Sequence, residues 1–146
     1  MLVMGDHLIS ASHVSAVISG AQSAGESCVL ATSLPGLQTD NDDATKVLTE
    51  PGGRILEIGK MLRRYNAIDT GVFSMTPRIF DALDLASTAG DASLTAGNRL
   101  LAEAGHLLSH SIDTLPWQDV DTSDDLSAAE RLAGSMGDGD DASGTT

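Results

Sequence analysis

The stretch Ala67-Ile68-Asp69-Thr70-Gly71-Val72-Phe73-Ser74-Met75 leads directly into Thr76-Pro77 in this chain of 146 residues. Its large apolar residues lie around Gly71, a pattern that predicts a buried strand. Thr76 and Pro77 have the chemistry of an N-cap and a first helical residue, so we expect a helix to begin here and to run through Leu85. A strand followed at once by a helix indicates an α/β domain.

The residues upstream continue this alternation. Leu2-Val3-Met4 is typical of the end of a buried strand. Residues 10–21 predict a short helix capped by Ser10 or Ser12, and residues 27–32 predict the next strand. A strand, a helix and a strand in succession favour a mainly parallel sheet.

Two further patterns complete the expected sheet and its flanking helices. Residues 45–49 and 54–58 are β-branched runs on either side of Glu50-Pro51-Gly52-Gly53, which predicts a β-hairpin. Ser93 or Thr95 can cap a helix that ends before Gly105, and residues 106–112 predict another strand. The expected fold class is α/β, with a mixed, mainly parallel sheet, flanking helices and a hairpin.

The C-terminal segment divides into a helix and a tail. Thr122 or Ser123 precedes Asp124 and Asp125, acidic residues that stabilise the first turn of a helix, and Arg131 is expected near its last turn. From residue 134 onward the chain is mostly Gly, Asp, Ser and Thr and has almost nothing to bury. We expect a domain over residues 1–133 and a disordered acidic tail over residues 134–146.

Composition excludes several classes of protein. The chain has 8 basic and 21 acidic side chains and a formal net charge of −13, so it lacks the basic surface that nucleic-acid binding requires. The hydrophobic content of 41% is that of a folded domain. Cys28 is the single cysteine, and no apolar run reaches the roughly 18 residues of a membrane helix. A cytoplasmic location is the expectation.

Carboxylates at expected strand ends are the first candidates for chemistry. Asp6 follows a strand and a glycine, and Asp119 and Asp121 are two residues apart in an extended stretch, so their side chains point the same way. Converging carboxylates would hold Mg²⁺, which prefers oxygen ligands. The alternative is that Asp6 caps the following helix and that Asp119 and Asp121 are turn residues.

Basic and histidine residues are the second group of candidates. Half of the basic residues lie in or just after the hairpin and could receive an anionic substrate, or could form a solvated rim: Lys46, Lys60, Arg63 and Arg64. His7 and His13 could bind a metal only if both faced one centre, and a surface or capping role is the alternative. The sequence has neither a nucleophile elbow of the G-x-S-x-G type nor a glycine-rich phosphate loop that opens a helix.

Several short motifs, in order and spacing, resemble the sugar-phosphate nucleotidyltransferases, and among them the inositol-1-phosphate cytidylyltransferases. They are Gly5-Asp6-His7, Asp43-Ala44-Thr45-Lys46-Val47, Ile58-Gly59-Lys60, Tyr65-Asn66-Ala67-Ile68-Asp69-Thr70-Gly71-Val72-Phe73, Pro77-Arg78-Ile79-Phe80-Asp81-Ala82-Leu83 and Trp117-Gln118-Asp119-Val120-Asp121-Thr122. The resemblance implies a Rossmann-like nucleotide-diphospho-sugar transferase fold. It also implies transfer of a nucleotidyl group from CTP or another nucleoside triphosphate to a sugar or polyol phosphate such as inositol 1-phosphate.

The resemblance assigns roles to particular residues. Asp6 and Asp121 are the implied Mg²⁺ ligands, with Asp119 beside them, and Lys60 is placed to meet the acceptor phosphate. The implied acceptor-binding residues are Asn66, Asp69, Thr70 and Gly71, with Lys46 as a weaker candidate.

The family's first strand and glycine-rich loop, which bind the nucleotide, have no counterpart in this sequence. We therefore expect the sheet to be incomplete and the isolated chain to have little transferase activity. A complementing N-terminal chain or a homo-oligomer is a possible partner. The alternative function is a non-catalytic or regulatory remnant of the fold that binds a phosphorylated ligand or a partner, and a third interpretation is a fragment without function.

Overall fold

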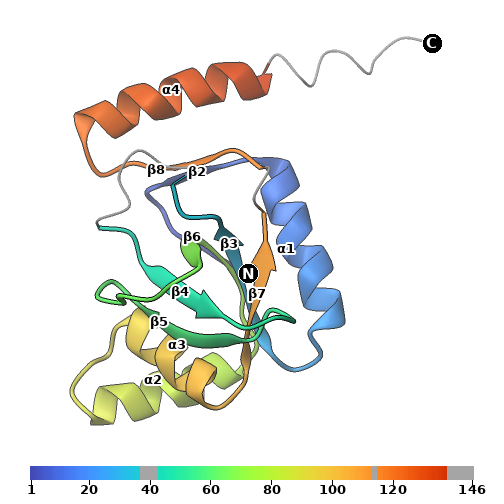
Figure 1. The fold of residues 1–146 in the computed structure, drawn as a ribbon, viewed down its shortest axis with the longest axis vertical. Coiled ribbons are helices and arrows are strands. Elements are labelled where there is room, and N and C mark those ends of the chain that lie inside the picture. Colours follow the sequence, from blue (N-terminus) through green and yellow to red (C-terminus); the bar gives the residue numbers. More distant parts are fainter. Residues whose placement is uncertain (37–42, 113–114, 138–146) are drawn as a thin grey trace.

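The computed structural model describes residues 1–36, 43–112 and 115–137. A mixed sheet forms the centre, with one helix packed on one face and two helices on the other (Figure 1). A second sheet of two short strands and the C-terminal helix lie beyond one end of the main sheet (Figure 1). None of the helices in the described residues is long and apolar enough to cross a membrane.

The main sheet has the strand order β5-β4-β6-β3-β7, and β1 pairs with β6 beside this path. These strands are β1 (Leu2–Val3), β3 (Cys28–Ser33), β4 (Lys46–Thr49), β5 (Ile55–Gly59), β6 (Ala67–Ser74) and β7 (Leu107–Ser111). The expected hairpin is confirmed, since β4 and β5 pair antiparallel with Val47 opposite Ile58. The long strand predicted after Tyr65 is also confirmed, as β6.

The expectation of a mainly parallel sheet is wrong. Among the described strands β3 and β7 pair parallel, whereas β6 pairs antiparallel with β1, β3 and β4. The strand, helix and strand predicted at the start do exist, and β1 and β3 run the same way because both are antiparallel to β6. However, β6 lies between them, so the two parallel strands are not neighbours. The alternation of elements predicted the relative direction of β1 and β3, but it did not predict which strands are neighbours in the sheet.

In the described part of the chain, four helices flank the sheets: α1 (Ala11–Ser23), α2 (Arg78–Thr88), α3 (Leu94–Glu103) and α4 (Ser123–Gly137). Alternation along the strands divides the core in two. Leu30 and Phe73 belong to the cluster that packs on α2 and α3, while Ala31 and Val72 belong to the cluster that packs on α1. Both faces of β3 and β6 are therefore buried.

Helix capping follows the sequence at three ends and departs from it at one. Ser10 and Ser93 accept hydrogen bonds from the backbone of the first turns of α1 and α3, as expected. At the start of α4 the backbone N–H of Thr122 donates to the carboxylate of Asp125, and the backbone N–H of Asp125 donates to the hydroxyl of Thr122. The N-cap role expected for Thr76 is wrong, because its hydroxyl donates to the carbonyl of Glu26 and α2 begins without a side-chain cap.

Helix α4 also extends beyond its expected end. It continues to Gly137, past residue 134, from which the sequence predicts a tail, and Arg131 is not in the last turn. The rest of the expected disordered tail, residues 138–146, lies outside the described residues.

His13 connects α1 to β6 through a buried hydrogen bond. Its Nε2 lies 3.0 Å from the Thr70 hydroxyl, which itself donates to the carbonyl of Ala31 at 2.9 Å. The hydroxyl therefore accepts from His13, and Nε2 must carry the proton. Because the side chain has no exposed surface, burial lowers the pKa of His13 from 6.5 to about 4 and keeps the ring neutral.

This burial predicts an acid-sensitive contribution to stability. Below pH 6.5 the unfolded chain takes up a proton that folded His13 does not, so the free energy of unfolding falls by about 2 kcal/mol between pH 6.5 and pH 4.5. Urea unfolding across this range should show a smaller fall for His13→Gln, which retains a donor for Thr70. The control His106→Gln should behave as wild type. An equal pH dependence in wild type and His13→Gln would contradict the assignment.

Candidate metal and phosphate site

The register of the small sheet brings two polar side chains face to face. Strands β2 (His7–Ile9) and β8 (Trp117–Asp119) pair antiparallel, with His7 directly opposite Asp119. Directly opposed residues point to the same side of a sheet. The His7 ring also stacks on Trp117, two residues before Asp119, with ring centroids 5.8 Å apart and planes within 9°. The indole thus fixes the plane of the imidazole.

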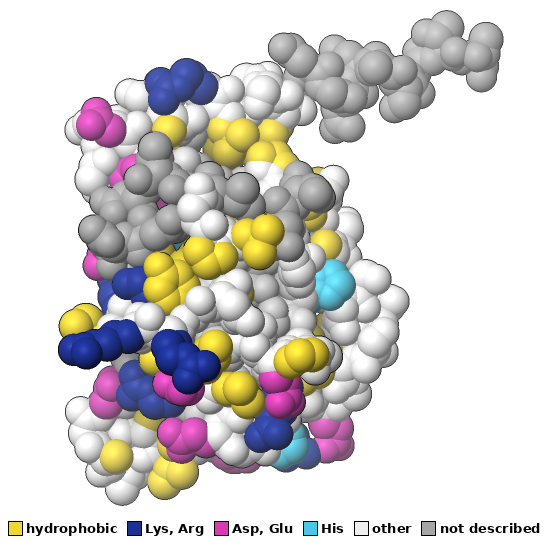
Figure 2. All heavy atoms as spheres, in the orientation of Figure 1, with side chains coloured by type: hydrophobic (Ala, Val, Ile, Leu, Met, Phe, Trp, Pro, Cys, Tyr) yellow, Lys and Arg dark blue, Asp and Glu magenta, His cyan; other side chains and the backbone are white. Residues whose placement is uncertain are grey.

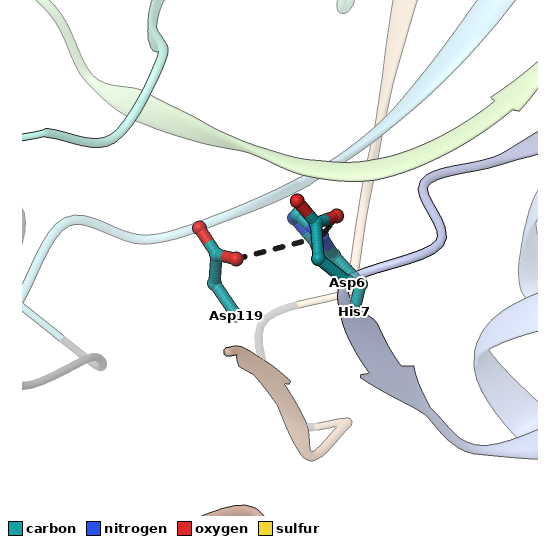
Figure 3. A group of neighbouring side chains, drawn as sticks. All are labelled: Asp6, His7 and Asp119. Carbon is teal, nitrogen blue, oxygen red and sulfur yellow. Dashed lines mark hydrogen bonds and ion pairs between the residues drawn. The ribbon is translucent and has the colours of Figure 1, made fainter. Parts of the chain in front are cut away.

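Asp6 completes a cluster of three residues on this face. Its Oδ1 lies 2.8 Å from Nδ1 of His7, and Oδ1 of Asp119 lies 3.7 Å from the same nitrogen. Figure 3 shows the Asp119 carboxylate turned toward Asp6 and His7 across the two strands. One ligand atom from each of the three residues lies within 4.8 Å of the others. A carboxylate only accepts hydrogen bonds, so His7 donates from Nδ1 to Asp6.

The two carboxylates of the cluster have opposite electrostatic surroundings. The hydrogen bond from His7 lowers the pKa of Asp6. Burial raises the pKa of Asp119, and the charges of Asp121 and Asp6 add to this effect. Oδ1 of Asp119 is buried without a hydrogen-bond partner among the described residues. A partly buried carboxylate that lacks a donor favours a positively charged ligand.

A bulge in β6 makes room for this cluster. Leu30 lies opposite Phe73, but Thr32 lies opposite Asp69, so β6 carries extra residues between the two pairs. Gly71 lies in this bulge with φ of +75°, and a Cβ there would lie 2.6 Å from the His7 ring. The backbone N–H of Gly71 donates to Asp69 at 2.7 Å. Glycine at this position thus allows the imidazole to pack on the strand.

A pocket of about 280 Å³ opens beside the cluster. Six of the nine expected site residues line it, together with His7: Asp6, Lys60, Asp69, Gly71, Asp119 and Asp121. Burial raises the pKa of Asp69 to about 6, although the N–H of Gly71 partly offsets this effect. The pocket therefore combines several carboxylates with one lysine.

Lys60 provides the positive charge of the pocket. Its Nζ donates to both oxygens of the Asp43 carboxylate at 3.0 Å, and 56% of the Lys60 side chain is exposed. Surface ion pairs of this kind are weak and exchange readily for another anion. Figure 2 shows that most of the visible Lys and Arg side chains lie on the side of the molecule that carries the β4–β5 hairpin.

Three expected substrate-binding residues do not line the pocket. Thr70 is buried in its hydrogen bonds to His13 and Ala31. Asn66 binds the backbone of Thr49 at both its oxygen and its nitrogen, which ties the loop before β6 to β4. These two side chains support the strand that carries the site.

Lys46, the third of these residues, lies on β4 and supports the pocket lysine. Its Nζ donates to the carbonyl of Lys60 at 3.0 Å and lies 5.7 Å from the centre of the Tyr65 ring. Lys46 thus holds the backbone that presents Lys60.

His7 is the residue of the cluster to which the family resemblance assigned no role. The condition for metal binding, that His7 and His13 face one centre, fails because His13 points into the core between α1 and β6. His7 instead joins two aspartates. A prediction that residues 7–9 form a strand paired with residues 117–119 would have placed His7 opposite Asp119. Strands of three residues are too short to be predicted well from sequence.

Curated relatives align with most of this chain. The Bifunctional IPC transferase and DIPP synthase of Archaeoglobus fulgidus is 30% identical over 131 residues, 90% of this chain and 24% of that protein. The protein of the same name from Rubrobacter xylanophilus is 36% identical over 94 residues, 64% of this chain and 21% of that protein. The chain thus spans about a quarter of the length of these relatives. No family model matches it.

A solved structure shows the same fold. The inositol-1-phosphate CTP transferase from T. maritima superposes with a TM-score of 0.78 and 28% identity, over 94% of this chain and 55% of that one. The α/β fold of this chain therefore matches that of nucleotidyltransferase domains. Within this class, the chain is homologous to part of the IPC transferases, which are inositol-1-phosphate cytidylyltransferases.

The contact between Gly71 and His7 predicts a position-specific cost of adding a methyl group. Gly71→Ala should lower the free energy of unfolding by about 2 kcal/mol or more, because a positive φ is strained for alanine and the Cβ meets the imidazole. Urea unfolding measures this change. Gly25→Ala is the matched control, since Gly25 has φ of +61° and a Cβ added there would meet nothing within 4 Å. Equal costs at the two positions would contradict the close packing of His7.

Proposed function

We propose that this chain forms the metal-binding and acceptor-binding part of a nucleotidyltransferase that uses a sugar or polyol phosphate. The observation that carries the proposal is one pocket that brings Asp6, Asp119 and Asp121 together with Lys60. Carboxylates suit a hard divalent cation, and a single exposed lysine suits a phosphate. The homology to IPC transferases supports inositol 1-phosphate as the acceptor and CTP as the donor.

The donor atoms of the pocket fit Mg²⁺. Asp119 offers a buried oxygen without a partner among the described residues, and Asp6 keeps its negative charge because His7 lowers its pKa. Asp121 lines the same pocket but lies outside the compact group of three, so we assign it to a water-mediated or substrate-completed position. A bound Mg²⁺ would neutralise the charge of the nucleotide phosphates during transfer.

The protein's own residues would position the two reactants. Lys60 exchanges Asp43 for the acceptor phosphate, and His7 holds Asp6 in place. In the proposed reaction an oxygen of the acceptor phosphate forms a bond to the α-phosphorus of the nucleoside triphosphate, and the bond to pyrophosphate breaks. No covalent intermediate with the protein is needed, because positioning and charge neutralisation supply the catalysis.

Metal binding tests the carboxylate assignment. We expect wild type to bind Mn²⁺, as a probe for Mg²⁺, in the millimolar range, and Asp6→Asn and Asp119→Asn to weaken this binding about tenfold or more. Electron paramagnetic resonance of free Mn²⁺ measures the affinity. Asp84→Asn, on helix α2 away from the pocket, is the matched control.

Asp119→Asn has an opposite effect on the stability of the metal-free protein. Because burial raises the pKa of Asp119, its ionised form costs folding free energy at neutral pH, and Asp119→Asn should raise the melting temperature of the metal-free protein. Equal Mn²⁺ binding by wild type and both site variants would contradict the metal site.

Turnover tests the proposal that this chain forms only part of the active site. The 146 residues contain no glycine-rich loop that opens a helix, so we expect the isolated chain to release no pyrophosphate above background from CTP, inositol 1-phosphate and Mg²⁺. A coupled phosphate assay measures the release, with the full-length T. maritima enzyme as the positive control. Turnover at an ordinary enzymatic rate would show that these residues form a complete active site.

A further inference from the structure

One polar side chain lies on the buried face of α3. Leu94, Asn98 and Leu101 follow the i, i+4, i+7 spacing that places residues on one side of a helix. Leu101 belongs to the core cluster and Leu94 packs against it, so this side faces the sheet (Figure 1). An amide thus occupies a position where the pattern predicts a third apolar residue.

Asn98 also lines the pocket described above, on its buried side. The exposed fraction of Asn98 is 1%, as is that of its fellow lining residue Phe73. The lining residues Lys60 and Asp121, in contrast, are exposed and mark the mouth. The fully buried lining residues are thus apolar apart from the amide of Asn98, and Asp69 beside them is partly buried.

The amide oxygen of Asn98 is not satisfied by the protein. Oδ1 is buried and has no hydrogen-bond partner among the described residues. Buried polar atoms are nearly always hydrogen-bonded, and an unpaired acceptor costs folding free energy. Leucine would fill a similar volume without this cost. The orphaned acceptor is explained if its partner comes from a molecule that enters the pocket.

We propose that Asn98 is a specificity-determining residue that accepts a hydrogen bond from a ring hydroxyl of the acceptor. This inference rests on the proposed function, in which Lys60 binds the phosphate of the same molecule at the mouth. The two residues then divide recognition: Lys60 reads the phosphate, which any phosphorylated compound shares, and Asn98 reads the polyol or sugar body. Sites with few polar groups among apolar ones use those groups for specificity in this way.

The test compares probes that share a phosphate and differ in hydroxyls. The affinity of wild type for inositol 1-phosphate, glucose 1-phosphate and inorganic phosphate is measured by titration calorimetry in Mg²⁺. We expect Asn98→Leu to weaken the better-bound sugar or polyol phosphate about tenfold while leaving inorganic phosphate unchanged. Lys60→Ala should weaken all three probes. Gln22→Leu, the same kind of change on the exposed surface of α1, is the matched control.

A second variant separates recognition from packing. Asn98→Ala leaves a cavity where Asn98→Leu does not, so their urea stabilities should differ, yet both should lose the same preference for the sugar or polyol phosphate over inorganic phosphate. Retention of that preference in both variants would overturn the role of Asn98 and leave the proposed function intact. Absence of binding of either organic phosphate to wild type would overturn the proposed function and this inference with it.

Discussion

Strand β6 is the constraint on which the rest of the structure depends. It pairs with β1, β3 and β4, and both of its faces are covered, so its backbone position fixes the sheet. At the bulge in its centre two adjacent residues do opposite things. Thr70 turns into the α1 side of the core and holds His13, while Gly71 leaves space for the ring of His7. The packing of α1 and the position of the pocket are therefore coupled through two consecutive residues.

The pocket concentrates more negative charge than its single lysine can neutralise. Asp69, Asp119 and Asp121 line it with one lysine, and burial raises the pKa of both Asp69 and Asp119. Such an arrangement lowers stability as long as no cation is bound, since the ionised forms of Asp69 and Asp119 are partly desolvated. The carboxylates that lower stability therefore lie where binding is proposed. Binding sites commonly reduce the stability of the protein that carries them. Asp119 and Asn98 each have a buried side-chain oxygen without a hydrogen-bond partner among the described residues. The oxygen of Asp119 suits a cation, and that of Asn98 suits a hydroxyl donor.

The division of the pocket also explains why the expected substrate-binding residues fall into two groups. Side chains of a strand alternate between faces, so consecutive residues of β6 cannot all face a ligand. Asp69 and Gly71 lie on the side of the pocket, whereas Thr70 lies on the other face and supports α1. Asn66 and Lys46 support the pocket indirectly. Asn66 donates to the backbone carbonyl of Thr49, and Lys46 donates to that of Lys60. A motif assigned as a whole to binding thus contains residues that line the pocket and residues that support the strand beside it.

The sequence by itself determined the local elements. Apolar runs, glycine and proline positions and capping serines placed the hairpin, strand β6 and helices α1 and α3, because these features depend on neighbours a few residues apart. The motifs also identified six of the residues that line the pocket, including Asp6, Asp119 and Lys60. Strand neighbours were decided only by the tertiary structure, since the antiparallel insertion of β6 between β1 and β3 joins residues far apart in the chain. The positions of His7 and Asn98 were also decided only by the tertiary structure. His7 lies opposite Asp119 on the paired strand, and Asn98 lines the pocket. Neither contact can be predicted from neighbouring residues in the sequence.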